Sequence, residues 1–177
     1  MAKLFLAIPI PNAAASALAG IQPPSAPGVR LVLPDQMHLT LCFIGESQIE
    51  PIAAAIRNVR IPKLILDIVG VGQFPSVAGS TMLWAGIRPD SALVSLHAAL
   101  SNALAPLGFQ PEHRPYRPHI SLARCEPSVP AGLVATFLAD RASFTLDRIV
   151  IDALSLYSSH FVAGIPVYHP EVTFPLS

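Results

Sequence analysis

Hydrophobic residues gather in short runs along this chain, and Gly or Pro stands at most of their ends. Runs rich in β-branched, aliphatic and aromatic residues predict strands. These runs are 3–8, 30–33, 37–44, 64–71, 81–87, 119–123, 144–157 and 167–174. Asp152 is among the charged residues that interrupt the longest run, so we expect 144–157 to be two strands or one strand with a bulge.

Four segments between these runs predict helices. The first covers 13–19 and ends at Gly20, and the last covers 132–139. The residues 47–50 have the pattern of a capping box and lead into a helix over 51–59. In the third helix, leucines at helical spacing form one apolar stripe, with Asp90 or Ser91 as its cap and its end before Gly108. That stripe consists of Leu93, Leu96, Leu100 and Leu104.

The connections between several neighbouring strands are too short for a helical crossover. The pattern therefore predicts an α+β fold with antiparallel sheets. The chain has 177 residues, 52% hydrophobic and 12% charged, which indicates a single domain over 1–177 with a full core. Its formal net charge is zero, whereas a protein that coats long nucleic acid usually has a basic excess. If it handles nucleic acid, we expect it to bind an end or a small fragment.

The N-terminal segment and the two cysteines carry information about the cellular compartment of the protein. Lys3 and the apolar run after it superficially resemble a secretory signal, but Pro9 and Pro11 interrupt the pattern. No apolar run approaches the ~20 residues that a membrane-spanning helix needs. Cys42 and Cys125 have neither the number of a disulfide framework nor the spacing of metal ligands. We expect free thiols and a cytoplasmic protein.

Two similar stretches carry the candidate chemistry: His38-Leu39-Thr40-Leu41 and His119-Ile120-Ser121-Leu122. Residues two apart on a strand point to the same face, so each stretch presents an imidazole beside a hydroxyl. One such match is expected by chance, but two inside aliphatic strands favour a site. Two imidazoles can act as acid and base, and two hydroxyls can hold an oxyanion between them. The His-x-hydroxyl motif recurs about half a chain apart, which predicts two similar lobes that share a cleft. Such a site can cleave phosphoesters without a metal.

The segments around these motifs also carry a family resemblance. They are 30–45 and 117–124, together with 3–8, 72–75, 83–87, 156–159 and 167–170. With them the chain resembles the 2H phosphoesterase superfamily, and within it the bacterial RNA 2′,3′-cyclic phosphodiesterases, historically named 2′-5′ RNA ligases. The chain departs from the family pattern at Ser121, where Thr is usual, and at His169, where Glu is common.

The resemblance implies two pseudo-symmetric lobes with antiparallel sheets and outer helices, and an active-site cleft between them. It implies hydrolysis of RNA 2′,3′-cyclic phosphate ends to 2′-phosphomonoesters, with His38 as proton donor and His119 as proton acceptor. Thr40, Ser121 and Arg124 would bind the phosphate, with no metal and no cofactor. Strict alternation puts Arg124 on the face opposite His119, so this role requires that the strand end or twist by Ala123.

The sequence is also compatible with other functions. The same acid and base can run the reverse reaction, 2′-5′ RNA ligation. A small cyclic nucleotide, or an ADP-ribose-type cyclic phosphate, is an alternative substrate, and a non-catalytic module that binds RNA ends is an alternative of another class. We expect a monomer with no membrane partner that acts in RNA processing. Phe5, Trp84 and Tyr157 are expected to pack in the core rather than to stack on a base.

Overall fold

The computed structural model describes residues 2–177. Its strands are β1 (Ala2–Pro9), β2 (Val29–Leu31), β3 (His38–Ser47), β4 (Leu64–Pro75), β5 (Thr81–Ile87), β6 (His119–Cys125), β7 (Thr145–Ile151), β8 (Ala153–Val162) and β9 (Ile165–Pro175). Its α-helices are α1 (Asn12–Ala19), α2 (Ile49–Arg57), α3 (Ser91–Leu104) and α4 (Ala131–Asp140). Three 3₁₀ helices complete the elements: η1 (Pro34–Gln36), η2 (Val77–Gly79) and η3 (Ala105–Leu107).

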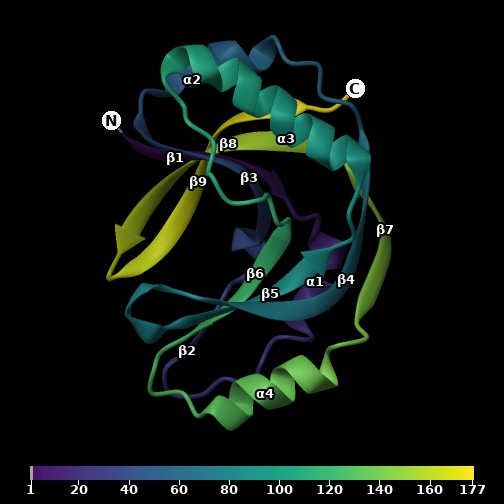
Figure 1. Ribbon diagram of the computed structural model, residues 1–177, viewed down its shortest axis with the longest axis vertical. Coiled ribbons are helices and arrows are strands. Elements are labelled where there is room, and N and C mark those ends of the chain that lie inside the picture. Colours follow the sequence, from purple (N-terminus) through teal and green to yellow (C-terminus); the bar gives the residue numbers. More distant parts are fainter. Residues whose placement is uncertain (1) are drawn as a thin grey trace.

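All strand pairs of the described chain are antiparallel and form one curled sheet in the order β7-β4-β5-β6-β3-β1-β8-β9, with β2 paired to β6. The sheet has two halves, one on each side of the β3–β6 junction. At that junction one register pair joins the halves, Leu39 opposite Ile120. Beyond this pair no further register pair joins β3 and β6, and the two halves of the sheet lie on either side of the junction (Figure 1). The α+β class, the antiparallel pairing and the two-lobed sheet are therefore confirmed.

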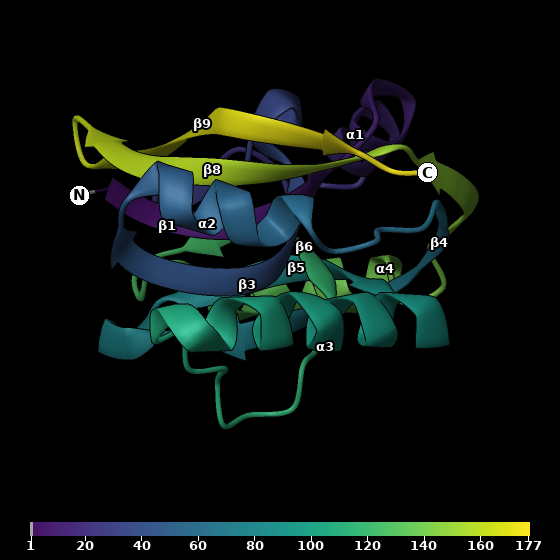
Figure 2. The same ribbon diagram turned by 90° about the horizontal axis from the view of Figure 1, so that it is seen from above.

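Helices α2, α3 and α4 lie at the outer ends of the molecule (Figure 1). Figure 1 shows α2 and α3 together at one end of the molecule and α4 at the other end. Seen from above in Figure 2, α3 runs along the outside of the sheet next to β3. All four leucines of the α3 stripe are buried, as predicted. Asp90 caps the helix, since its Oδ1 accepts a hydrogen bond of 2.9 Å from the Leu93 amide.

Some predicted boundaries are wrong. Ser47 still belongs to β3, where it pairs with Ala2, so the predicted capping box does not form. Gln48 is the N-cap of α2, and the helix begins at Ile49, two residues earlier than predicted. The run 144–157 is two strands, which separate at Asp152. Strand β4 extends to Pro75 because its second half pairs with β5 in a hairpin.

The core supports both halves of the sheet. Its buried residues form one continuous cluster, which includes the aliphatic residues of both histidine motifs. Cys42 and Cys125 are buried free thiols, as predicted. No helix within residues 2–177 is long and apolar enough to cross a membrane.

Candidate active site

Both histidine motifs place their polar side chains on the same side of the junction between the halves. In β3, His38 and Thr40 are half-buried while Leu39 and Leu41 are fully buried. Strand β6 repeats this alternation from His119. The register pair that joins the halves is formed by the residue between His and hydroxyl in each motif. The two imidazoles and two hydroxyls therefore lie on one surface, as the sequence predicts.

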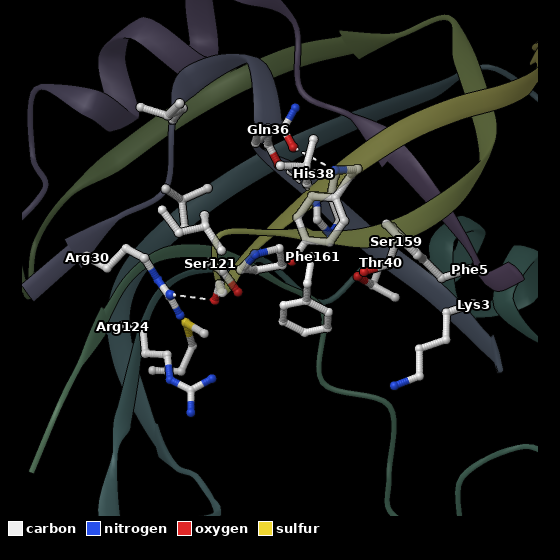
Figure 3. A pocket seen from close by; sticks show the side chains of 18 of the residues that line it. Lys3, Phe5, Arg30, Gln36, His38, Thr40, Ser121, Arg124, Ser159 and Phe161 are labelled. Atoms are coloured by element: carbon white, nitrogen blue, oxygen red, sulfur yellow. Dashed lines mark hydrogen bonds between the residues drawn. The ribbon is translucent and has the colours of Figure 1, made fainter. Parts of the chain in front are cut away.

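That surface lines a cleft of about 1130 Å³. His38, Thr40, His119 and Ser121 line it, and so does Arg124. Figure 3 shows Arg124 on one side of the cleft and Lys3 on the opposite side. The structure thus brings all five predicted site residues together.

Backbone hydrogen bonds fix the orientation of both imidazoles. His38 Nδ1 lies 2.8 Å from the carbonyl oxygen of Gln36, and His119 Nδ1 lies 2.7 Å from that of Arg117. A carbonyl oxygen only accepts, so in both rings Nδ1 carries the proton. Nε2 is then the nitrogen that is free to accept or deliver a proton. In each motif the acceptor stands two residues before the histidine, which makes the two arrangements local equivalents.

Aromatic rings surround each imidazole. The centroid of the His38 ring lies 5.1 Å from that of Phe5 and 4.9 Å from that of Tyr168, which meets it edge-on. The His119 ring lies 4.9 Å from Phe74, also edge-on, and 6.0 Å from Trp84. These rings hold the imidazoles in place and remove water from their sides. The sequence predicts that Phe5, Trp84 and Tyr157 pack in the core; Phe5 is buried but lines the cleft, and Trp84 and Tyr157 are half-buried beside the histidines. No pattern in the sequence indicated that Phe74 and Tyr168 contact the histidines.

The cleft favours the neutral form of both imidazoles. Burial lowers the pKa of His38 from its ordinary value of 6.5, and the nearby His119 lowers it further, against the effect of the Gln36 carbonyl. Burial also lowers the pKa of His119, against the Arg117 carbonyl. An anion between the two rings stabilises the protonated form and raises both pKa values. An anionic ligand in the cleft therefore counteracts the effect of burial on both imidazoles.

A β-bulge in β6 settles the position of Arg124. Opposite β5, Ala123 pairs with Leu83 and Ser121 pairs with Trp84, so Leu122 is the extra residue. Leu122 and Ala123 are both buried, and the alternation resumes one residue later with Arg124 exposed. The bulge therefore places Arg124 on the same face as His119 and Ser121, which is the twist that its predicted role requires.

Strand β3 has a bulge at the corresponding place. Thr40 pairs with Ala7 and Cys42 pairs with Leu6, which leaves Leu41 as the extra residue. Phe43, five residues after His38, consequently faces the cleft with 63% of its surface exposed. The two lobes thus supply equivalent positions, one aromatic and one cationic. Both bulges coincide with two consecutive apolar residues, Leu41-Cys42 and Leu122-Ala123. A prediction based on strict alternation does not take such pairs into account.

Two further residues support the motifs through contacts distant in sequence. The Gln36 side chain accepts a hydrogen bond of 2.9 Å from the Tyr168 amide, which ties β9 to the turn before His38. The Tyr116 hydroxyl donates to the Thr40 carbonyl at 2.9 Å, just beyond the point where β3 and β6 separate. Tyr116 stands three residues before His119, so this bond links the two motifs. Within residues 2–177, no cluster of three or more His, Cys, Asp or Glu side chains is arranged to hold a metal ion.

A two-lobed antiparallel sheet with one His-x-hydroxyl strand from each lobe in a shared cleft defines a 2H phosphoesterase. A family model described as the 2′-5′ RNA ligase superfamily matches residues 10–154, and the chain belongs to this superfamily.

Named relatives agree with this assignment. The RNA 2′,3′-cyclic phosphodiesterase of Aeropyrum pernix is 25% identical over 145 residues, which cover 79% of this chain and 82% of the relative. That of Escherichia coli is 29% identical over 145 residues, covering 80% of this chain and 76% of the relative. The crystal structure of E. coli LigT complexed with 3′-AMP matches with a TM-score of 0.76 at 26% identity, over 99% of this chain and 98% of that chain.

Proposed function

We propose that this protein hydrolyses RNA 2′,3′-cyclic phosphate ends to 2′-phosphomonoesters by acid–base catalysis with its two cleft histidines. The observation that carries the proposal is the matched pair of imidazoles, each with Nδ1 held by a backbone carbonyl and Nε2 free in one cleft. The names of the relatives, RNA 2′,3′-cyclic phosphodiesterase, support this substrate. The 3′-AMP bound to the E. coli structure supports a ribonucleotide in the cleft.

The proposed reaction is an in-line displacement at phosphorus. His119 Nε2 accepts a proton from water while the water oxygen bonds to phosphorus. The bond from phosphorus to the 3′ oxygen breaks, and His38 Nε2 donates the proton that this oxygen needs. The products are a 2′-phosphate and a 3′-hydroxyl, and the two histidines return to their starting states by exchanging protons with solvent. Each proton transfer contributes ~10²–10⁴-fold to such rates.

The other predicted site residues bind the phosphate. The hydroxyls of Thr40 and Ser121 flank the cleft on its two strands and donate to the non-bridging oxygens, where charge increases in the transition state. Arg124 presents a guanidinium beside Ser121, and its planar donors match phosphate geometry. Phe43, exposed toward the same cleft, offers a face on which the terminal base stacks. The negative substrate also raises the pKa of His38, which counteracts the effect of burial and supplies the protonated acid.

We further propose that the 177 residues act as one bilobal domain and as a monomer in the cytoplasm, without a metal. The cleft is built from both halves of one chain, so a second copy is not needed to complete it. The free buried thiols fit a reducing compartment.

The test uses a short oligoribonucleotide that ends in a 2′,3′-cyclic phosphate, incubated with the protein in EDTA. We expect a mass gain of one water and a product that carries only the 2′-phosphate, at the rate seen without EDTA. A 3′-phosphate product would contradict the proposed leaving group, and loss of activity in EDTA would contradict metal independence. With a 5′-hydroxyl RNA present, a joined product in place of hydrolysis would favour ligation. Binding without turnover would favour the end-binding module.

A further inference from the structure

Two arginines face each other across neighbouring strands at the edge of the cleft. Arg30 of β2 stands directly opposite Arg124 of β6, and both side chains line the cleft. Like charges at opposite positions of an antiparallel pair destabilise the pairing unless something compensates them. Figure 3 shows the two guanidinium groups on the same side of the cleft. The strand pairing at this position is therefore unfavourable unless an opposite charge lies nearby.

No carboxylate in the described part of the chain neutralises this pair. The ion pairs of residues 2–177 involve Arg57, Arg88, Arg114 and His169, but neither Arg30 nor Arg124. Asp35 and Glu126 line the same cleft without forming an ion pair with either arginine. The compensation that the pair lacks within the protein is what a bound anion supplies.

The side chain of Arg30 reaches toward the β8–β9 hairpin. Arg30 is half-buried as a residue, and its Nη1 donates an exposed hydrogen bond of 3.4 Å to the carbonyl oxygen of Gly164 at the tip of that hairpin. A guanidinium has five N–H donors, so this contact leaves most of them available. Burial raises the pKa of Tyr168, and the positive charge of Arg30 partly offsets that rise. Arg30 thus acts electrostatically on the residue that packs against His38.

The cleft extends from the two histidines to both arginines. Its volume of about 1130 Å³ lies above the ~300–1,000 Å³ typical of small-molecule sites. Along β6, the order on the cleft face is His119, Ser121 and Arg124, and Arg30 lies beside Arg124 on the neighbouring strand β2. A ligand bound at the histidines and Arg124 therefore has a second cationic side chain next to it, that of Arg30.

We infer that Arg30, together with Arg124, forms a second phosphate subsite, which binds the phosphate on the 5′ side of the nucleotide that carries the cyclic phosphate. Arg124 lies beside Arg30 and contacts both phosphates. The inference rests on the proposed function and specifies its substrate class: ends that carry a phosphate 5′ to the terminal ribose. That phosphate comes either from an internal phosphodiester of RNA or from a 5′-phosphate on a mononucleotide.

The test compares three substrates with wild-type protein, Arg30→Gln, Arg30→Lys and the surface control Arg114→Gln. The substrates are adenosine 2′,3′-cyclic phosphate, the same nucleotide with a 5′-phosphate, and the dinucleotide ApA with a 2′,3′-cyclic phosphate. We expect a lower KM for the two substrates with a second phosphate in wild-type protein and in Arg114→Gln. Arg30→Gln is expected to lose roughly tenfold in kcat/KM on those two substrates through KM, and nothing on the first. Arg30→Lys should keep part of the preference, because it retains the charge but not the planar donors.

The outcomes separate the subsite from other roles of Arg30. An equal loss on all three substrates would make Arg30 only a support for the hairpin tip and would overturn the inference. Equal KM values of wild-type protein for all three would overturn it while hydrolysis itself stands. A gain with the dinucleotide alone would assign the subsite to an internal phosphodiester, and a gain with both would assign it to either source.

Binding measured by calorimetry keeps the test independent of turnover. Adenosine 3′,5′-bisphosphate should bind wild-type protein more tightly than 3′-AMP, and Arg30→Gln should remove the difference. If no substrate is turned over, the proposed reaction fails, and this comparison still decides the subsite. Equal affinities in wild-type protein would overturn it.

Discussion

At the scale of single residues, the site depends on which nitrogen of each imidazole is free. The carbonyls of Gln36 and Arg117 hold Nδ1 of His38 and His119, so both rings present Nε2 to the cleft. The surrounding rings and the buried position disfavour the charged form of both. A proton donor and a proton acceptor are both required, so the free protein is active only where one ring has gained a proton and the other has not.

The pH dependence follows from the lowered pKa values of both histidines. As pH rises through these values the acid loses its proton, and as pH falls below them the base becomes protonated. We expect a bell-shaped profile of kcat/KM with its maximum below pH 6.5, since both pKa values lie below that ordinary value. In the profile of kcat, the bound phosphate raises both pKa values and moves the alkaline limb to higher pH. The imidazole C2 protons in NMR spectra of the free protein give the two pKa values directly, and values above 6.5 would contradict the effect of burial.

At the scale of elements, close packing between β4 and β5 positions the rings around His119. A Cβ at Gly72 of β4 would overlap the Trp84 ring, so only glycine lets the indole lie over the strand. Trp84 in turn contacts Phe74 and His119. The hairpin that β4 and β5 form is thus part of the support for the second histidine.

Replacement of Gly72 by Ala should therefore move Trp84 and affect both stability and activity. We expect Gly72→Ala to lower the free energy of unfolding by about 1–3 kcal/mol, as overpacking does, and to reduce kcat. Gly132→Ala is the matched control, because no atom lies within 4 Å of its Cβ position and it is exposed in α4. It should stabilise by about 0.4–1 kcal/mol without a change in kcat. Chemical denaturation measures the free energy of unfolding of both variants, and steady-state kinetics measure kcat. A wild-type free energy of unfolding for Gly72→Ala would contradict the close packing of Trp84 on this glycine.

The strands and helices also show which features the sequence patterns predict correctly. Alternation of apolar residues correctly placed His38, Thr40, His119 and Ser121 on one surface, because both strands are regular up to that point. It failed for Arg124, since a bulge is a property of the pairing between two strands and not of one strand. The capping box failed for a similar reason, because pairing with β1 keeps Ser47 in β3.

At the scale of the whole molecule, two lobes meet at one register pair and each contributes an equivalent set of groups. The repeated His-x-hydroxyl motif predicted this arrangement. The contacts that complete the cleft join positions far apart in the chain, such as Arg30 with Gly164 and Gln36 with Tyr168. Such contacts depend on how the lobes and hairpins come together, so no local pattern in the sequence indicates them. Arg30 and Tyr168 lie in segments that carry the family resemblance, but only the structure shows these contacts.

The central claim is that Nε2 of both histidines carries the chemistry, and replacement by asparagine tests it most directly. The Asn amide can keep the hydrogen bond that Nδ1 makes to the backbone carbonyl, while it removes Nε2. The measurement is kcat on the cyclic-phosphate oligoribonucleotide for His38→Asn, for His119→Asn and for the control His113→Asn, whose side chain is exposed outside the cleft. We predict a loss of ~10²–10⁴-fold for each of the first two and wild-type activity for the control. Wild-type turnover by either His38→Asn or His119→Asn would contradict the account.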